Sequence, residues 1–121
     1  MFDVVFYEDE SGYSELYEQL QELVKYSESN KDARIQLKQI TLHIELLKNQ
    51  GAKLPNNITK FLKDDIWELR PGHNRILYFY FKDYKFVLLH MFRKKTQKTP
   101  KQEIEKAKRE MNDYKSRDGG K

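Results

Sequence analysis

Apolar residues in the first half of the chain recur with the period of an α-helix. One stripe recurs at i, i+4, i+7 and i+8 and predicts an amphipathic helix that opens at Ser11 or Gly12. A second stripe predicts a helix from about Lys31 to Asn49, which Gly51 ends. A polar break at residues 27–30 joins the two into a helical hairpin. The first stripe is Leu16, Leu20, Leu23 and Val24, and the second is Ala33, Leu37, Ile40, Ile44 and Leu47.

Four apolar and aromatic runs have the length and composition of β-strands. They are Phe2–Tyr7, Ile66–Arg70, Arg75–Phe81 and Tyr84–Phe92. Turn residues at 71–72 and 82–83 separate the last three runs. Residues 51–63 contain proline and asparagine, and they are expected to form a connection with one short turn at 58–62.

The last element carries an explicit helix start. Thr99 suits the N-cap, Pro100 the first helical position and Gln102 the third, which completes a capping box. The helix is expected to run to about Tyr114, with a frayed tail at 116–121. The elements together predict an α+β fold in a single domain over residues 1–115, with an N-terminal strand and a helical hairpin packed on an antiparallel sheet and a C-terminal helix.

The register of the hairpins decides which polar side chains meet. If the last hairpin has a two-residue loop, Arg75 lies directly opposite His90. For the turn before it, a two-residue loop pairs Glu68 with Arg75 and a four-residue loop pairs Arg70 with Arg75. Both of these loops place Glu68 and Arg70 on the face of Arg75 and His90, whereas a three-residue loop would not, because a slip by one residue moves the side chains of a strand to the other face.

The other face of these strands is almost wholly apolar and is expected to lie under the helices. It carries Trp67, Leu69, Ile76, Tyr78, Val87, Leu89 and Met91. The polar face is therefore the candidate site. Four further apolar residues on it need cover from the last helix or from a partner, and they are Leu77, Phe79, Phe86 and Leu88.

Charge is unevenly distributed along the chain. Residues 1–59 carry 6 Lys and Arg against 10 Asp and Glu, a net charge of −4, whereas residues 60–121 carry 17 against 9, a net charge of +8. A cluster of cations follows the last strand directly. Such a basic half indicates an anionic partner, or simply a soluble surface with uneven charge.

The composition excludes several classes of protein. The 121 residues contain no cysteine, which excludes disulfides and thiolate metal sites. No apolar run approaches the roughly 20 residues of a membrane span, and the first residues lack the pattern of a signal peptide, so we expect a cytoplasmic protein without membrane contact. His43 and His73 have no metal-ligand spacing, and no glycine-rich phosphate loop occurs, so no cofactor is expected.

The segments Ile66–Arg70, Asn74–Tyr78 and Leu88–Pro100 occur in this order and spacing, followed by Glu103, Ile104 and Ala107. In them the chain resembles the RelE/HigB-like toxins of bacterial toxin–antitoxin pairs, particularly the phage-related HigB branch. The resemblance implies a RelE-like fold with a curved sheet, and cleavage of messenger RNA in the ribosomal decoding site. It also implies a cognate antitoxin as partner, expected to be a helix-turn-helix protein of the HigA kind.

The resemblance matches Arg75, Arg70, Lys94 and Lys95 to basic positions of the family. Metal-free RNA cleavage needs cations for the charge that develops on the phosphate, and arginine suits this role because it binds phosphate bidentately. A base must also take the 2′-hydroxyl proton and an acid must protonate the leaving oxygen. His90 suits either role, and so does Lys94 or Lys95, unless these lysines only bind phosphate.

Further RNA-binding candidates are Phe92, Arg93, Lys98 and Glu68. Phe92 could stack on a base or belong to the core, and Glu68 could act as a base or as an ion-pair partner. The leading hypothesis is a ribosome-dependent endoribonuclease toxin that inhibits translation. The alternatives are a non-catalytic nucleic-acid-binding module, or a protein-interaction domain that docks a partner on its apolar sheet face.

Overall fold

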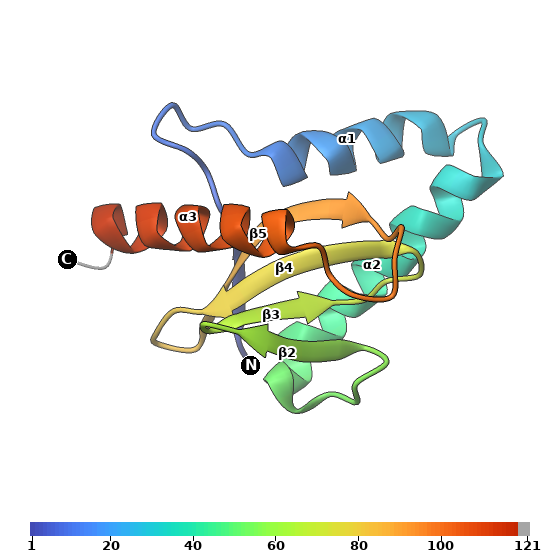
Figure 1. Ribbon diagram of the computed structural model, residues 1–121. Helices are drawn as coiled ribbons and strands as arrows, with labels where there is room; N and C mark the ends of the chain where they lie inside the picture. Colours follow the sequence, from blue (N-terminus) through green and yellow to red (C-terminus); the bar gives the residue numbers. More distant parts are fainter. Residues whose placement is uncertain (119–121) are drawn as a thin grey trace.

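One five-stranded sheet lies between two helical layers in the computed structural model, which describes residues 1–118 (Figure 1). The strands are β1 (Asp3–Phe6), β2 (Thr59–Lys63), β3 (Ile66–Leu69), β4 (Asn74–Tyr80) and β5 (Lys85–Arg93). The helices are α1 (Glu15–Ser27), α2 (Lys31–Gln50) and α3 (Lys101–Asp118), and a short 3-10 turn, η1, spans Gly51–Lys53. The predicted α+β class is confirmed.

The strands are ordered β1-β5-β4-β3-β2 across the sheet. β1 runs parallel to β5, and every other neighbouring pair is antiparallel. The sheet is therefore mixed rather than antiparallel throughout. The reason is that β1 lies beside the last strand, to which no hairpin turn connects it, so the chain direction is not forced to reverse.

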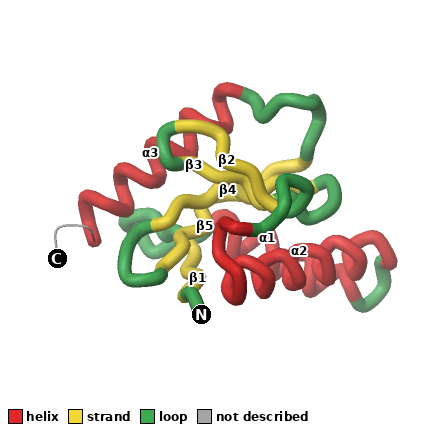
Figure 2. Tube along the Cα trace, turned by 90° about the horizontal axis from the view of Figure 1, so that it is seen from below, coloured by secondary structure: helices red, strands yellow, loops and turns green. Residues whose placement is uncertain are grey.

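The helices cover opposite faces of the sheet (Figure 2). α1 and α2 pack on one face through Leu16, Ile40 and Leu47. α3 packs on the other face through a second apolar cluster that includes Ala107, Met111 and Tyr114. The expected cover of Leu77 and Phe79 by the last helix is confirmed, because both belong to this second cluster.

The predicted helical hairpin is also confirmed, but its first helix begins at Glu15 and not at Ser11 or Gly12, because the amides of Ser11 and Tyr13 donate to the Asp9 carboxylate. Ser14 caps α1 by accepting a hydrogen bond from the Tyr17 amide, and Asn30 caps α2 by accepting one from the Ala33 amide. α2 ends at Gly51, as predicted, where φ is +66°. None of the helices in residues 1–118 is long and apolar enough to cross a membrane.

The predicted connection over residues 51–63 is wrong at its C-terminal end, where β2 forms. β2 pairs with β3, and the turn between them has positive φ at Asp64 (52°) and Asp65 (68°). Aspartate tolerates this conformation better than most residues. β2 is an edge strand in which only Thr59 is buried, so it lacks the apolar alternation that revealed the other strands.

The predicted register of the last hairpin is wrong by one residue near the turn and by two residues further on. The turn has three residues, 82–84, rather than two, as the hydrogen bond from the Phe81 amide to the Lys85 carbonyl shows. A β-bulge then adds Leu89 to β5, so that beyond it Leu77 lies opposite His90.

The longer turn and the bulge together change which side chains share a face. The extra residue in the turn makes residues 86–89 exchange faces relative to the prediction, because side chains alternate with a period of two. Phe86 and Leu88 pack toward α1 and α2, and Val87 and Leu89 pack toward α3. The bulge then returns the following residues to their predicted faces, so that Arg75 lies opposite Phe92 instead of His90 while His90 and Phe92 stay on the α3 side of the sheet.

The start of α3 differs from the predicted capping box. The amides of Glu103 and Ile104 donate to the Pro100 carbonyl, whereas the Thr99 hydroxyl donates to Glu68 on β3. The Thr99 hydroxyl bonds to the carboxylate and not to the first turn of α3, because a hydrogen bond to an ionised acceptor is stronger than one between neutral groups. At the other end, α3 continues through Asp118, past the predicted end at Tyr114, and the rest of the predicted frayed tail lies outside the described residues.

Replacement of Gly51 by alanine is expected to lower the free energy of unfolding by about 2–4 kcal/mol. The positive φ costs a non-glycine residue roughly 1–2 kcal/mol, and the new Cβ would lie 2.8 Å from Cε2 of Phe2. Gly12 is the control, because its φ is +85° but no atom lies within 4 Å of an added Cβ. Urea unfolding of Gly51→Ala and Gly12→Ala compares them, and equal losses would contradict the close-packing role of Gly51.

Candidate functional site

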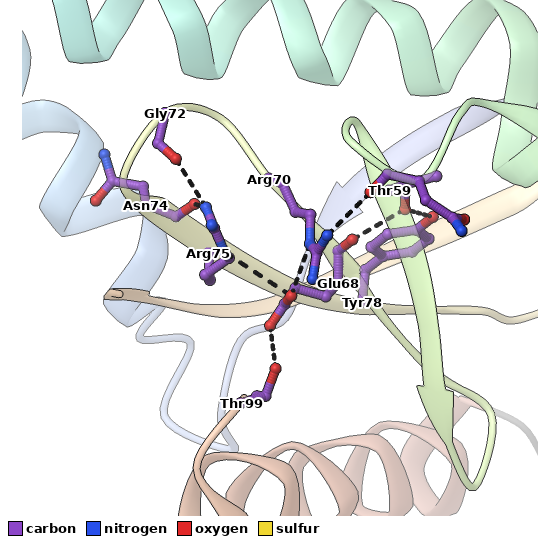
Figure 3. A network of polar contacts seen from close by, with 9 residues as sticks. Thr59, Glu68, Arg70, Gly72, Asn74, Arg75, Tyr78 and Thr99 are labelled. Atoms are coloured by element: carbon purple, nitrogen blue, oxygen red, sulfur yellow. Dashed lines mark hydrogen bonds and ion pairs between the residues drawn. The ribbon is translucent and has the colours of Figure 1, made fainter. Parts of the chain in front are cut away.

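A buried carboxylate on β3 gathers polar side chains on the α3 side of the sheet (Figure 3). Glu68 is 2% exposed. Its Oε1 lies 3.0 Å from Nε of Arg70 and 3.8 Å from Nε of Arg75. Thr99, in the loop before α3, donates its hydroxyl to Oε2 of Glu68 over 2.5 Å. These four residues are called the Glu68 cluster below.

The strand register places the two arginines side by side. Leu69 lies opposite Ile76 in the β3–β4 pair, so the loop between the strands has four residues. Arg70 and Arg75 therefore occupy the next opposed positions, and the four-residue option predicted from the sequence is the one observed.

Backbone carbonyls fix both guanidinium groups. Nη1 of Arg70 donates to the Asn56 carbonyl over 3.0 Å, and Nη1 of Arg75 donates over 2.8 Å to the carbonyls of Gly72 and Asn74 (Figure 3). Within residues 1–118, Nη2 of neither arginine donates to a protein group. A guanidinium carries five N–H donors in a fixed fork, so each arginine keeps donors for a ligand.

The charges in the Glu68 cluster do not cancel. Two guanidinium groups share one carboxylate, so the cluster carries a net charge of +1. Burial lowers the pKa of Arg75, the carboxylate of Glu68 opposes this by raising it, and the charge of Arg70 lowers it further. The side chains of Arg70 and Arg75 are 24% and 11% exposed, so this positive charge is poorly screened by water and attracts an anion.

A second layer of hydrogen bonds holds the backbone beneath the cluster. The Thr59 hydroxyl of β2 donates to the Glu68 carbonyl over 3.0 Å, and its oxygen lies 2.7 Å from the Tyr78 hydroxyl of β4. Burial raises the pKa of Tyr78 to about 12, so the phenol stays neutral. Three strands are thereby linked at the level of Glu68.

A groove of about 830 Å³ opens beside the cluster, between β2 and the segment that leads into α3. Among the described residues, Glu105 is the carboxylate that lines it, against six cations. The cations are Lys60, Lys63, Arg70, Lys95, Lys98 and Lys101. A narrower pocket, lined by Glu68, Arg75, Phe92 and Lys94, shares residues 95–100 with this groove.

The structure brings most of the predicted site residues to these two hollows. Lys95 and Lys98 are exposed and line both, and Lys94 and Phe92 line the narrower pocket with Arg75. Arg93 is separate, because it lines a different hollow formed with α1. Its strand position explains this, since neighbouring residues of a strand point to opposite faces.

His90 does not reach the surface. Its side chain is 1% exposed, with Nδ1 2.6 Å from Oε1 of Glu110 and Nε2 3.0 Å from Oε1 of Glu103. The predicted direct opposition of His90 and Arg75 is wrong, because the bulge in β5 shifts the register. In this structure the imidazole connects β5 to α3.

Sequence reasoning missed four residues of the site, one of which is Lys101 at the start of α3. Lys60 and Lys63 lie on β2, which was predicted as loop, and Thr99 was assigned to helix capping. The Asp64-Asp65 pair between two short runs rich in threonine, phenylalanine, isoleucine and tryptophan is the signal that could have revealed the β2–β3 hairpin. No three His, Asp or Glu side chains in residues 1–118 gather as a metal-ligand set.

The sequence of this chain matches one protein family over most of its length. The chain belongs to the family described as phage-derived protein Gp49-like (DUF891), with a match over residues 16–112. No curated protein matches the sequence.

Solved structures show which fold this is. A YoeB–YefM complex from Staphylococcus aureus has 16% identity over 75% of this chain and 94% of that chain, with a TM-score of 0.51. A YoeB dimer from the same organism has 14% identity over 78% and 97%, with a TM-score of 0.52. The protein therefore has the fold of the YoeB toxin, and the predicted RelE-like fold is confirmed.

Replacement of Glu68 by glutamine is expected to lower the free energy of unfolding by about 3 kcal/mol, because two partly buried guanidinium groups lose their counter-charge. Glu105→Gln is the control. It removes the Glu105 carboxylate, which lines the nearby groove and forms no ion pair within residues 1–118. This variant should change the free energy of unfolding by about 0.5 kcal/mol or less. Urea unfolding measures both, and similar small losses would show that the Glu68 cluster does not organise the fold here.

Proposed function

We propose that this protein is the toxin of a toxin–antitoxin pair, and that it inhibits translation by cutting messenger RNA on the ribosome. The observation that carries the proposal is the Glu68 cluster, in which two fixed arginines present free N–H groups beside a cation-lined groove. Arginine pairs of this kind match the oxygens of a phosphodiester. The YoeB-like fold supports the proposal.

In the proposed reaction the 2′-oxygen of one nucleotide attacks the adjacent phosphorus atom. The bond from phosphorus to the 5′-oxygen of the next nucleotide breaks, which leaves a 2′,3′-cyclic phosphate and a free 5′-hydroxyl. Arg75 and Arg70 bind the two non-bridging oxygens and stabilise the extra negative charge of the pentavalent transition state. The positive charge of these side chains supplies the stabilisation, so the proposed step needs no metal ion.

Two protons move in this reaction, one from the 2′-hydroxyl and one to the 5′-oxygen. Lys94 and Lys95 are our candidates for these transfers, because Lys94 lines the pocket of Arg75 and Lys95 lines both hollows. Both carboxylate oxygens of Glu68 are engaged, one by the arginines and one by Thr99. We therefore propose that Glu68 orients the arginines.

His90 has a supporting role in this proposal. It is enclosed between β5 and α3 and bound by two carboxylates, so it holds α3 in place. Phe92 and Lys98 are proposed to contact RNA, since they line the narrower pocket with Arg75. Phe92 offers an aromatic ring there for a base.

The proposed partners are a cognate antitoxin, the ribosome and messenger RNA. Two of the similar structures are complexes of YoeB with YefM. By analogy we propose that an antitoxin binds this chain, and that it is a helix-turn-helix protein if the chain belongs to the HigB branch. A substrate held by the ribosome implies action in the cytoplasm.

Replacement of Arg75 by alanine should reduce cleavage of ribosome-bound message by about 100- to 1,000-fold, the usual effect of removing one group that stabilises transition-state charge. Arg109→Ala is the matched control, because Arg109 is exposed on α3 and its loss should leave the rate within about twofold. Circular dichroism establishes that both variants are folded. A folded Arg75→Ala protein that cleaves normally would contradict the role assigned to Arg75, whereas a wild-type protein that binds RNA without cleaving the message would favour a non-catalytic nucleic-acid-binding module.

Cleavage should depend on the ribosome. The narrower pocket holds a few cations and one aromatic ring, which is little to orient a flexible RNA, and orientation can be worth roughly 7–11 kcal/mol of the barrier. A ribosome that holds the codon would supply that orientation. Cleavage of one labelled message is compared with and without programmed ribosomes, and equal rates on naked RNA would reject ribosome dependence.

A further inference from the structure

We infer that the groove between β2 and the start of α3 holds the single-stranded RNA that flanks the cleaved phosphate. Lys60 and Lys63 of β2 bind its phosphates. The inference rests on the proposed function and adds a second wall to the RNA site, built by the edge strand of the sheet.

The register of β2 connects this wall to the Glu68 cluster. Lys60 lies directly opposite Glu68 in the β2–β3 pair, and opposed residues share a face with their Cβ atoms about 5 Å apart. Arg70 belongs to the cluster and also lines the groove. An RNA strand with one phosphate at the two arginines can therefore extend along β2, past Lys60 to Lys63.

The charges of the groove select a polyanion. Two lysines from β2 face three lysines from the other wall, and within residues 1–118 none of these five forms an ion pair. Five ammonium groups around one groove repel one another unless an anion lies between them. A chain of phosphates places its charges at intervals along such a groove, as in other single-strand binding sites.

An acidic protein segment is the other polyanion that lysines could hold. The continuity of the groove with the Glu68 cluster favours RNA. The groove shares residues 95–100 with the pocket of Arg75, whose fork of donors suits a phosphate.

Binding of a labelled single-stranded 2′-O-methyl RNA tests the inference, because this RNA has no free 2′-hydroxyl and cannot be cleaved by the proposed route. Fluorescence anisotropy over a salt series compares the wild type with Lys60→Ala/Lys63→Ala. Lys31→Ala/Lys38→Ala is the charge-matched control, since both lysines are exposed on α2, on the other side of the sheet. Circular dichroism verifies folding, and a polyglutamate peptide is titrated in parallel.

For Lys60→Ala/Lys63→Ala we expect the slope of log affinity against log salt to decrease in magnitude by about 1.4, because each phosphate contact on a single strand contributes about 0.7. The control should keep the wild-type slope.

Equal slopes for the two double variants would overturn the inference, and so would tighter binding of polyglutamate than of RNA at the same lysines. The test is independent of catalysis. If Lys60→Ala/Lys63→Ala binds RNA like the wild type while ribosomal cleavage still requires Arg75, the groove inference fails and the proposed function stands. If the wild type does not cleave ribosome-bound message but the groove variants behave as expected, the proposed function fails and the groove inference stands.

Discussion

The site depends on one buried carboxylate between two guanidinium groups. Arg70 follows the last residue of β3 and Arg75 lies on β4, each next to the opposed pair of Leu69 and Ile76, so their like charges repel. Oε1 of Glu68 offsets this repulsion, because it accepts a hydrogen bond from Arg70 and forms an ion pair with Arg75. A buried ion pair adds little net stability compared with apolar packing, but loss of one partner is costly. The carboxylate is therefore required for the two arginines to coexist in this partly buried position.

The other oxygen of Glu68 links the sheet to the loop before α3. Thr99 donates to it, so the segment that carries Lys94, Lys95 and Lys98 is fixed against the arginines at one point. Further along, Glu103 and Glu110 of α3 bind the imidazole of His90 on β5. These contacts, together with the apolar packing of α3, hold the lysine-bearing wall of the groove at a constant place relative to the sheet.

The sequence was sufficient for those parts of the fold that follow from local pattern. The helical hairpin, its end at Gly51 and four of the five strands were predicted, because apolar periodicity and turn residues mark them. The grouping of Glu68, Arg70 and Arg75 on one face was also predicted, since it depends only on alternation along two short strands. The family resemblance pointed to the RelE-like fold that the structure shows.

The errors arise where structure is set by non-local contacts. No local signal marks the bulge at Leu89, which depends on packing across the sheet, and it removed His90 from its predicted place opposite Arg75. β2 was missed because an edge strand buries little and its residues are mostly polar. Thr99 has the residue type and position of a helix N-cap, but its hydroxyl donates to the carboxylate of Glu68, which is distant in sequence. These errors hid the second wall of the groove.

The central claim is that the arginines of the Glu68 cluster promote attack by a 2′-oxygen. The chemistry of the new RNA ends tests this most directly, together with a message that carries a single 2′-deoxynucleotide on the 5′ side of the cleaved bond. The account predicts a 2′,3′-cyclic phosphate and a 5′-hydroxyl on the normal message, and no cleavage at the deoxy position. Cleavage at that position with a 5′-phosphate product would mean that water is the nucleophile, and would contradict the account.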